Sequence, residues 1–145
     1  ILELYEKKKL RVLLAAPTGR AAMRMSEVTG KEAKTVHRLL EVEWTDGSNR
    51  PKFVRNMENP LEADAVIVDE LSMVDTHLFA ALLDALPLGC RLIMVGDSDQ
   101  LPPVGAGNVL QDIIFSGLLP RFLCTFSFIP TSFYYLYLHL LLFLL

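Results

Sequence analysis

The apolar residues of this chain fall into short continuous runs separated by segments with helical periodicity. Three stretches contain an uninterrupted apolar run rich in Val, Ile and Leu: RVLLAAP from Arg11, AVIVD from Ala65 and RLIMVGD from Arg91. Runs of this length without alternation are typical of strands that are buried on both faces. The pattern therefore predicts three buried strands, the first of them stopped by Pro17.

The segments between these runs predict helices and one long loop. The stretch ILELYEKKKL has the pattern of an amphipathic helix, and TGRAAMRMSEVTG is rich in helix formers and closes on Gly30 as a C-cap. A short helix is expected in KTVHRLLEVEW, a longer one in THLFAALLDALP after a cap at Asp75 or Thr76, and one in VLQDIIFSG that ends at Gly117. Residues 45–63 are polar and contain Gly, Pro and Asn, which predicts an irregular surface excursion.

Strands that alternate with helices, and that are apolar on both faces, predict an α/β fold with a parallel sheet covered on both sides. With 145 residues, the chain is long enough for one domain with a sizeable core and too short for two.

Charge and cysteine usage narrow the classes of function. The formal net charge of -3 provides no general electrostatic surface for nucleic acid, although it leaves room for local contacts to a single strand. Cys90 and Cys124 lack metal or redox spacing and are interpreted as small core residues in a reducing compartment. Together with three scattered histidines they make no zinc ligand set.

Candidate chemistry follows the three predicted strands. They run into the polar stretches APTGR, VDELS and VGDSDQLPP, each of which contains acidic, amide, hydroxyl or basic side chains. The carboxyl ends of neighbouring parallel strands meet at one edge of a sheet, which is where ligands bind in open α/β sheets. If the strands are adjacent, this edge collects Thr18, Arg20, Asp69, Glu70, Asp97 and Gln100.

These side chains suit nucleotide hydrolysis. Magnesium prefers oxygen ligands and keeps several waters, so Asp69 alone could hold it through the metal's water shell. Glu70 could orient or deprotonate the attacking water, and the amide of Gln100 could sense a terminal phosphate. Each motif also has an ordinary interpretation, as a strand end, a turn or a capped connection. The nucleotide interpretation is favoured by the ordered set of three, each after a buried strand.

Four stretches of the chain resemble the first motor domain of RecD-like helicases, which are superfamily 1 DNA helicases related to the alpha subunit of exodeoxyribonuclease V. They are LLAAPTGRAAMRM, KTVHRLL, AVIVDELSMVD and RLIMVGDSDQLPPVGAGNVLQDII, and the resemblance runs over about residues 1–120. It implies a RecA-like P-loop NTPase domain that uses ATP and magnesium. The implied partners are single-stranded and duplex DNA and the subunits of a nuclease complex, and the implied location is the cytoplasm.

The resemblance also implies roles for individual residues. PTGRAA is similar to motif Ia and TVH to a later DNA-contact motif, so the implied DNA-binding residues are Pro17, Thr18, Gly19, Arg20, Thr35 and His37. VDE is similar to the Walker B motif, with Asp69 for magnesium and Glu70 for the catalytic water. GDSDQLPP is similar to motif III, where Gly96 and Asp97 would contact the nucleotide and Gln100 would couple its terminal phosphate to the DNA path.

One family motif has no counterpart in these residues. The phosphate-binding loop G-x-x-x-x-G-K-[ST] should precede the opening helix, and no GKT or GKS occurs in the 145 residues. Removing a single preorganised donor of this kind costs a transition state roughly 3 kcal/mol. We therefore expect a motor domain truncated at both ends, with hydrolysis abolished and ATP binding weak or absent in these residues alone.

The tail, residues 121–145, departs from the family pattern in composition. From Phe122 onward it has no Asp, Glu, Lys or Arg. A frameshifted or mis-assigned end is the favoured interpretation; a membrane anchor is the second, because 24 helical residues at about 1.5 Å each would cross a bilayer core of about 30 Å. A buried core segment is the third. Residues 1–120 are accordingly expected to form the partial motor domain, with residues 121–145 outside it.

The expected function is that of an ATP-dependent DNA helicase fragment that couples hydrolysis to movement along a single strand and to unwinding, in recombination or repair. Stacking of bases, rather than reading of their edges, fits such a motor. Two alternatives stay open at this point: an ATP-independent module that binds single-stranded DNA, recognisable by salt-sensitive binding without nucleotide, and a membrane-tethered remnant.

Overall fold

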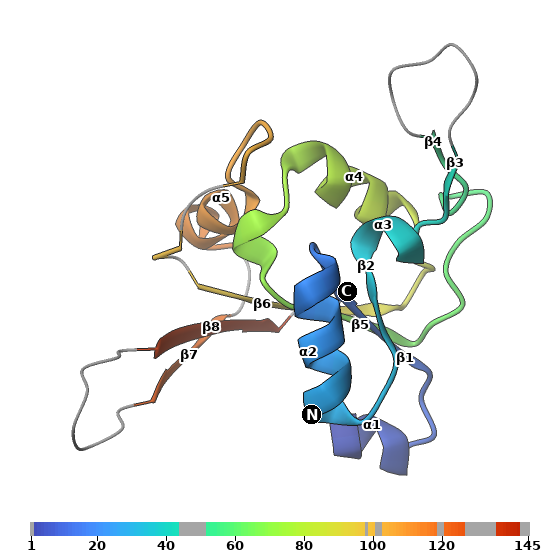
Figure 1. The fold of residues 1–145 in the computed structure, drawn as a ribbon, viewed down its shortest axis with the longest axis horizontal. Helices are drawn as coiled ribbons and strands as arrows, with labels where there is room; N and C mark the ends of the chain where they lie inside the picture. Colours follow the sequence, from blue (N-terminus) through green and yellow to red (C-terminus); the bar gives the residue numbers. More distant parts are fainter. Residues whose placement is uncertain are drawn as a thin grey trace.

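The computed structural model describes residues 2–43, 52–97, 99–100, 103–118, 121–126 and 136–142. Its main feature is a six-stranded sheet with the order β2-β1-β5-β6-β8-β7 (Figure 1). The first four strands are parallel: β2 (Ala33–Thr35), β1 (Val12–Ala16), β5 (Ala65–Val68) and β6 (Arg91–Gly96). The three predicted strands are thus confirmed as β1, β5 and β6, and they are direct neighbours.

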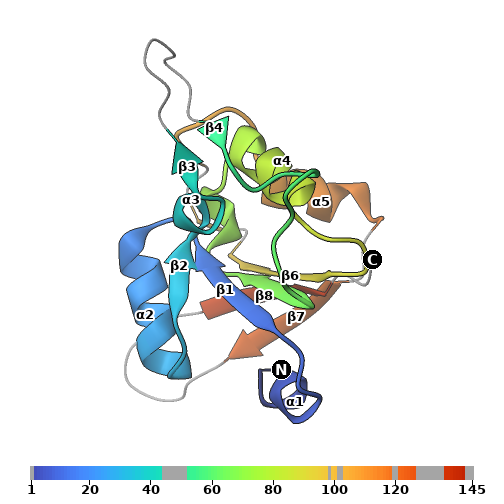
Figure 2. The same cartoon turned by 90° about the vertical axis from the view of Figure 1, so that its right-hand side faces the viewer.

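Helices cover both faces of this sheet, as predicted (Figure 2). On one face α1 (Leu2–Lys7) and α2 (Gly19–Thr29) cover a row formed by Leu14, Ile67 and Ile93, one from each of three adjacent strands. On the other face α3 (Val36–Leu39), α4 (Thr76–Asp84) and α5 (Val109–Ser116) cover the remaining strand residues. The fold is therefore the expected α/β arrangement, with helices on both faces of the parallel strands.

The caps expected from the sequence are present. Gly30 ends α2 in the left-handed conformation with φ of 68°, and Gly117 follows α5 with φ of 63°. Asp75, rather than Thr76, caps α4, because its side chain accepts the backbone N–H of Leu78 at 2.8 Å. Cys90 is buried, as expected, and this burial raises the pKa of its thiol.

The segment 33–43 differs from the prediction of one short helix. Residues 33–35 form the edge strand β2, helix α3 has only four residues, and β3 (Val42–Glu43) follows. Strand β3 pairs antiparallel with β4 (Lys52–Phe53), so part of the excursion predicted as irregular is a hairpin, while residues 44–51 lie outside the described residues. The physical reason is non-local: residues 33–35 gain backbone pairing with β1, which begins 21 residues earlier.

The tail contains two strands that the sequence did not predict. β8 (Leu136–Leu142) pairs antiparallel with β6, and β7 (Arg121–Phe126) pairs antiparallel with β8. The membrane-anchor interpretation assumed a helix, whereas these two segments are strands whose backbone groups pair in the sheet. Among the helices in the described parts of the chain, none is long and apolar enough to cross a membrane.

The loop before α5 lies against the start of α4. The backbone N–H of Thr76 donates to the carbonyl of Ala106 at 3.1 Å. A Cβ atom at Gly105 would lie 2.5 Å from Oδ2 of Asp75, and one at Gly107 would overlap the hydroxyl of Thr76. The two glycines therefore let this loop approach the helix cap closely.

We expect Gly107→Ala to lower the free energy of unfolding by about 3 kcal/mol, because it combines the left-handed strain at φ of 90° with the overlap at Thr76. Gly30→Ala is the matched control: it has the same kind of strain at φ of 68° but nothing within 4 Å of the added Cβ. It should cost about 1 kcal/mol. Urea unfolding of both variants measures the difference, and equal losses would contradict the close approach.

Candidate functional site

Three motif-bearing segments leave the sheet at the same edge. β1, β5 and β6 are neighbouring parallel strands, so their carboxyl ends adjoin one another. Pro17 follows β1, Asp69 follows β5 and Asp97 follows β6. The backbone N–H of Asp69 donates to the carbonyl of Ala15 at 2.9 Å, which continues the β1–β5 pairing into the first motif residue of β5. The predicted convergence of these segments is therefore what the topology produces.

Asp69 and Glu70 form a tight reversal at the end of β5. Both are half-buried, and Oδ1 of Asp69 accepts the backbone N–H of Glu70 at 2.9 Å. Glu70 has φ of 54° and ψ of 41°, which is the left-handed region that a residue with a Cβ adopts only at a cost. The short 3-10 helix η1 (Leu71–Met73) begins directly after it. The acidic pair thus belongs to a strained turn rather than to a frayed strand end.

Gln100 is joined to this turn by a side-chain hydrogen bond. The hydroxyl of Ser72, in η1, donates to Oε1 of Gln100 at 2.8 Å. The loop that carries Gln100 is closed by Asp97, whose side chain accepts the N–H of Asp99 at 2.9 Å and whose carbonyl accepts the N–H of Gln100 at 3.4 Å. The segments after β5 and β6 are therefore in direct contact. No pattern in the sequence indicated this contact of Ser72.

Gly96, at the end of β6, lies close to η1. A Cβ added at Gly96 would be 2.9 Å from Cδ2 of Leu110, 3.3 Å from the backbone nitrogen of Ser72 and 3.4 Å from Cβ of Leu71. Gly96 is also buried. Because β6 packs closely against η1, a side chain at this position would not fit. Gly96 therefore has a structural role in addition to the nucleotide contact that the resemblance implies.

The predicted DNA-path residues lie at the ends of β1 and β2. These two strands are paired, with Ala16 opposite Thr35, so the segments that follow them start side by side. Thr18 caps α2 by accepting the N–H of Ala21 at 3.2 Å, and Thr35 caps α3 by accepting the N–H of Arg38 at 3.2 Å. Their hydroxyls therefore already have structural roles. Gly19, Arg20 and His37 are exposed, and Pro17 is half-buried.

His37 belongs to a row of rings that the sequence did not reveal. Its ring centroid is 6.2 Å from that of Phe53, which in turn is 6.0 Å from that of His77. The three rings come from α3, β4 and α4, and both histidines are exposed. Phe53 between them is half-buried. Rings at the surface offer flat faces against which bases can stack.

At this edge of the sheet, a metal ion could be held by a single carboxylate, that of Asp69. Among the residues that the structure describes, no group of three or more His, Cys, Asp or Glu could hold a metal ion. Magnesium commonly uses one or two carboxylates and completes its shell with waters and substrate phosphates. Asp69 fits that pattern, because only one of its oxygens is used by the N–H of Glu70.

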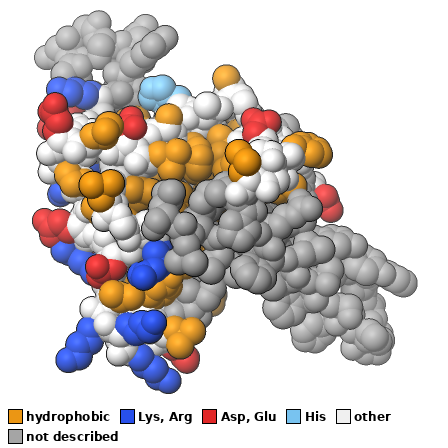
Figure 3. Space-filling view, turned by 180° about the vertical axis from the view of Figure 1, so that it is seen from behind, with side chains coloured by type: hydrophobic (Ala, Val, Ile, Leu, Met, Phe, Trp, Pro, Cys, Tyr) orange, Lys and Arg blue, Asp and Glu red, His pale blue; other side chains and the backbone are white. Residues whose placement is uncertain are grey.

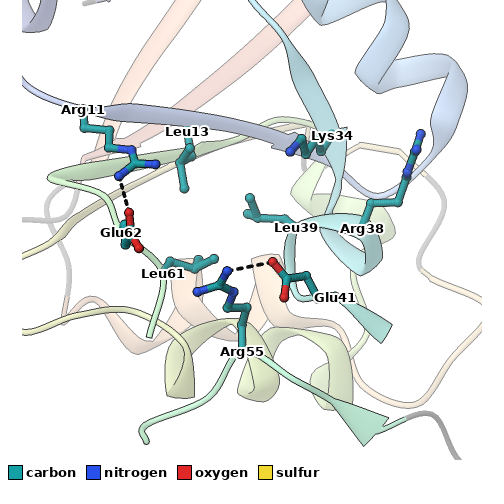
Figure 4. Close-up of a pocket in the computed structure, with 9 residues that line it drawn as sticks. All are labelled: Arg11, Leu13, Lys34, Arg38, Leu39, Glu41, Arg55, Leu61 and Glu62. Carbon is teal, nitrogen blue, oxygen red and sulfur yellow. Dashed lines mark hydrogen bonds and ion pairs between the residues drawn. The ribbon is translucent and has the colours of Figure 1, made fainter. Parts of the chain in front are cut away.

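A separate cavity of about 230 Å³ is lined by none of the predicted site residues (Figure 4). Its lining includes two ion pairs, Arg11–Glu62 and Arg55–Glu41, with nitrogen–oxygen distances of 2.5 and 2.8 Å. The hydrogen bond that Arg55 donates to Glu41 raises the pKa of the Arg55 guanidinium further. Because each of these arginines is matched by a glutamate, we assign the cavity no ligand.

Charged side chains do not form one continuous basic surface on the face displayed in Figure 3. Lys and Arg are interspersed there with Asp and Glu, apart from a group of basic side chains at the end of the molecule where α1 lies. This distribution agrees with the net charge of -3. Contacts to a nucleic acid would thus be local.

Comparisons with known proteins identify the family. A model described as an AAA domain matches residues 1–106. The ATP-dependent RecD2 DNA helicase of Deinococcus radiodurans is 49% identical over 107 residues, which cover 74% of this chain and 14% of that protein. The RecBCD enzyme subunit RecD of Mycobacterium tuberculosis is 39% identical over 128 residues, covering 77% of this chain and 21% of that protein. The chain thus spans about a seventh to a fifth of the length of these relatives.

Two further similarities extend the comparison. The ATP-dependent DNA helicase dda of phage T4 is 35% identical over 98 residues, covering 67% of this chain and 22% of that protein. A crystal structure of the Pif1 helicase from Bacteroides is similar with a TM-score of 0.47 and 27% sequence identity, covering 81% of this chain and 29% of that chain.

The strained turn at Glu70 can be tested with two variants that lose the same carboxylate. We expect Glu70→Gly to unfold at higher urea than Glu70→Ala, with a difference of about 0.5–1 kcal/mol, because only glycine adopts φ of 54° without a Cβ penalty. A Glu70→Ala variant as stable as Glu70→Gly would mean that this residue is not held in the left-handed conformation.

Proposed function

The chain belongs to the AAA domain family and, within it, to the RecD-like superfamily 1 helicases, and on that premise we propose that it is part of an ATP-driven motor that moves along DNA. The observation that carries the proposal is the meeting of three motif segments at the adjoining carboxyl ends of β1, β5 and β6. Residues 1–120 are the motor portion, and residues 121–145 stand outside the family pattern by composition.

On the nucleotide side, Asp69 and Glu70 have different roles. Asp69 holds magnesium through the metal's waters, and the bound ion supplies charge neutralisation at the phosphates. Glu70 orients or deprotonates the attacking water, and Gln100 contacts the terminal phosphate, with Gly96 and Asp97 lining the same edge. The left-handed conformation of Glu70 supports these two roles. It turns the backbone away from the direction of β5, so the two carboxylates do not follow a strand pattern.

These residues are one half of a hydrolysis site. The 145 residues contain no G-x-x-x-x-G-K-[ST] sequence, so they supply the magnesium and water-positioning groups without the cradle for the phosphates. By themselves they should therefore bind ATP weakly and not hydrolyse it. Hydrolysis belongs to a protein that brings such a cradle to the same edge of the sheet.

On the DNA side, the path runs over the ends of β1 and β2. Gly19, Arg20 and His37 are exposed there, next to Pro17, Thr18 and Thr35. Arg20 contacts phosphate, and the row of His37, Phe53 and His77 stacks bases. Contacts of these kinds are independent of base sequence, as a translocating motor requires.

The names of these relatives suggest the wider process in which the motor acts. Two of them are called DNA helicases, and another is called a subunit of the RecBCD enzyme. We therefore extend the proposal to duplex unwinding in recombination or repair in the cytoplasm, with other subunits of a nuclease complex as possible neighbours. An ATP-independent binding module is not favoured, because the named relatives are ATP-dependent enzymes.

In the full-length protein, we expect Glu70→Gln to lower the kcat of DNA-stimulated ATP hydrolysis by at least about 100-fold, because the water loses its base. Asp69→Asn should raise the magnesium concentration needed for half-maximal activity. Glu62→Gln is the matched control: Glu62 is exposed and pairs with Arg11 at the other end of β1, so activity should be unchanged. A Glu70→Gln enzyme with full activity is incompatible with the proposed role.

For the DNA path, we expect Arg20→Ala to weaken binding of a fluorescent oligo-dT by about fivefold and to reduce its dependence on salt, because one phosphate contact is lost. Phe53→Ala should also weaken binding, through lost stacking, but leave the salt dependence unchanged. Arg11→Ala is the control, since Arg11 precedes β1 at the opposite edge of the sheet. Fluorescence anisotropy over a salt series distinguishes these outcomes, and equal effects of Arg20→Ala and Arg11→Ala would rule out the path.

A further inference from the structure

Ser72 is unusual among the side chains that the structure describes. It is the single buried residue there with a polar or charged side chain, with a relative exposure of 5%. Its hydroxyl donates to Oε1 of Gln100 at 2.8 Å, across 28 residues of sequence. A buried hydroxyl that loses its partner destabilises the fold, so this bond holds the exposed Gln100 to a fixed part of the molecule.

The bond also fixes which end of the amide faces outward. Since Oε1 accepts from Ser72, the two N–H groups on Nε2 are available to another partner. If the amide were turned over, the hydroxyl hydrogen of Ser72 would lose this acceptor in a buried site. The preferred orientation therefore offers donors, rather than an acceptor, to whatever binds at the edge of the sheet.

The anchor itself lies in a buried and closely packed segment. Ser72 lies in η1, two residues after Glu70, and Leu71 beside it is fully buried. Strand β6 approaches so closely that a Cβ at Gly96 would be 3.3 Å from the backbone nitrogen of Ser72. In the described part of its loop, the backbone N–H of Gln100 is held by a long 3.4 Å bond to the carbonyl of Asp97. The hydrogen bond from Ser72 is the contact that fixes the direction of the Gln100 side chain.

We propose that Ser72 is a positioning residue: it holds the Gln100 amide so that its N–H groups face the terminal phosphate of the nucleotide, and it ties that contact to the segment of Asp69 and Glu70. This role rests on the proposed ATP-driven function. Ser72 itself touches no substrate, so its loss should change the catalytic step more than nucleotide binding.

The test is DNA-stimulated ATP hydrolysis in the full-length protein. Ser72→Ala should lower kcat about tenfold and leave the KM for ATP within about twofold, the loss expected for one positioning hydrogen bond. Ser72→Thr keeps the hydroxyl and should restore most of the rate. Ser116→Ala is the matched control, because the Ser116 hydroxyl also donates at 2.8 Å but only to the carbonyl of Ile113 in its own helix.

A second pair of variants separates positioning from stability. Gln100→Ala and the double variant with Ser72→Ala should have equal kcat, since Ser72 acts only through Gln100. Gln100→Glu keeps an acceptor for Ser72 but has no N–H donor, so it should be as slow as Gln100→Ala, and at this exposed site it should fold normally. Additive losses, or an active Gln100→Glu enzyme, would overturn the positioning role. A wild-type protein without ATP hydrolysis would instead overturn the proposed function.

Discussion

The parallel register of β1, β5 and β6 is the constraint on which the rest of the structure depends. Leu14, Ile67 and Ile93 stand opposite one another in three adjacent strands and are buried under α1 and α2. The alternate residues Val66 and Val68 are buried under the helices of the other face. A slip of one residue would exchange the two sets of side chains between faces that are shaped for different partners. The same register determines that Pro17, Asp69 and Asp97 leave the sheet at one edge.

The polar groups at that edge are held by a small number of specific contacts, and each depends on packing beneath it. Glu70 keeps its left-handed conformation because β5 before it and Leu71 after it are buried. Gly96 has to lack a side chain for η1 to approach β6, and this approach positions Ser72 beneath Gln100. The strain at Glu70 and the missing side chain at Gly96 each reduce stability locally, and the packing of the core offsets this loss. The apolar core is thus what makes the polar arrangement possible.

The sequence predicted what depends on local pattern and missed what depends on distant partners. Continuous apolar runs identified β1, β5 and β6, and caps such as Gly30 and Asp75 followed from residue type. Strand β2 has only three residues and no alternating pattern, and it exists because β1 offers it backbone partners. The strands of the tail likewise depend on pairing with β6. For the candidate site, the motif residues could be proposed from the sequence. Ser72 and Phe53 could not, because their contacts depend on which segments meet in the fold.

The two halves of the proposed function adjoin each other where β1 pairs with β5. The residues proposed to contact the nucleotide follow β5 and β6, and those proposed to contact DNA follow β1 and β2. Between them, the backbone N–H of Asp69 donates to the carbonyl of Ala15, two residues before Pro17. If the turn after β5 shifted and moved Asp69, this hydrogen bond would either break or pull Ala15 along. Either change would affect the start of the proposed DNA path. Coupling between ATP and DNA in the proposed motor therefore needs no long chain of intermediate residues, because both proposed sites lie at the ends of paired strands.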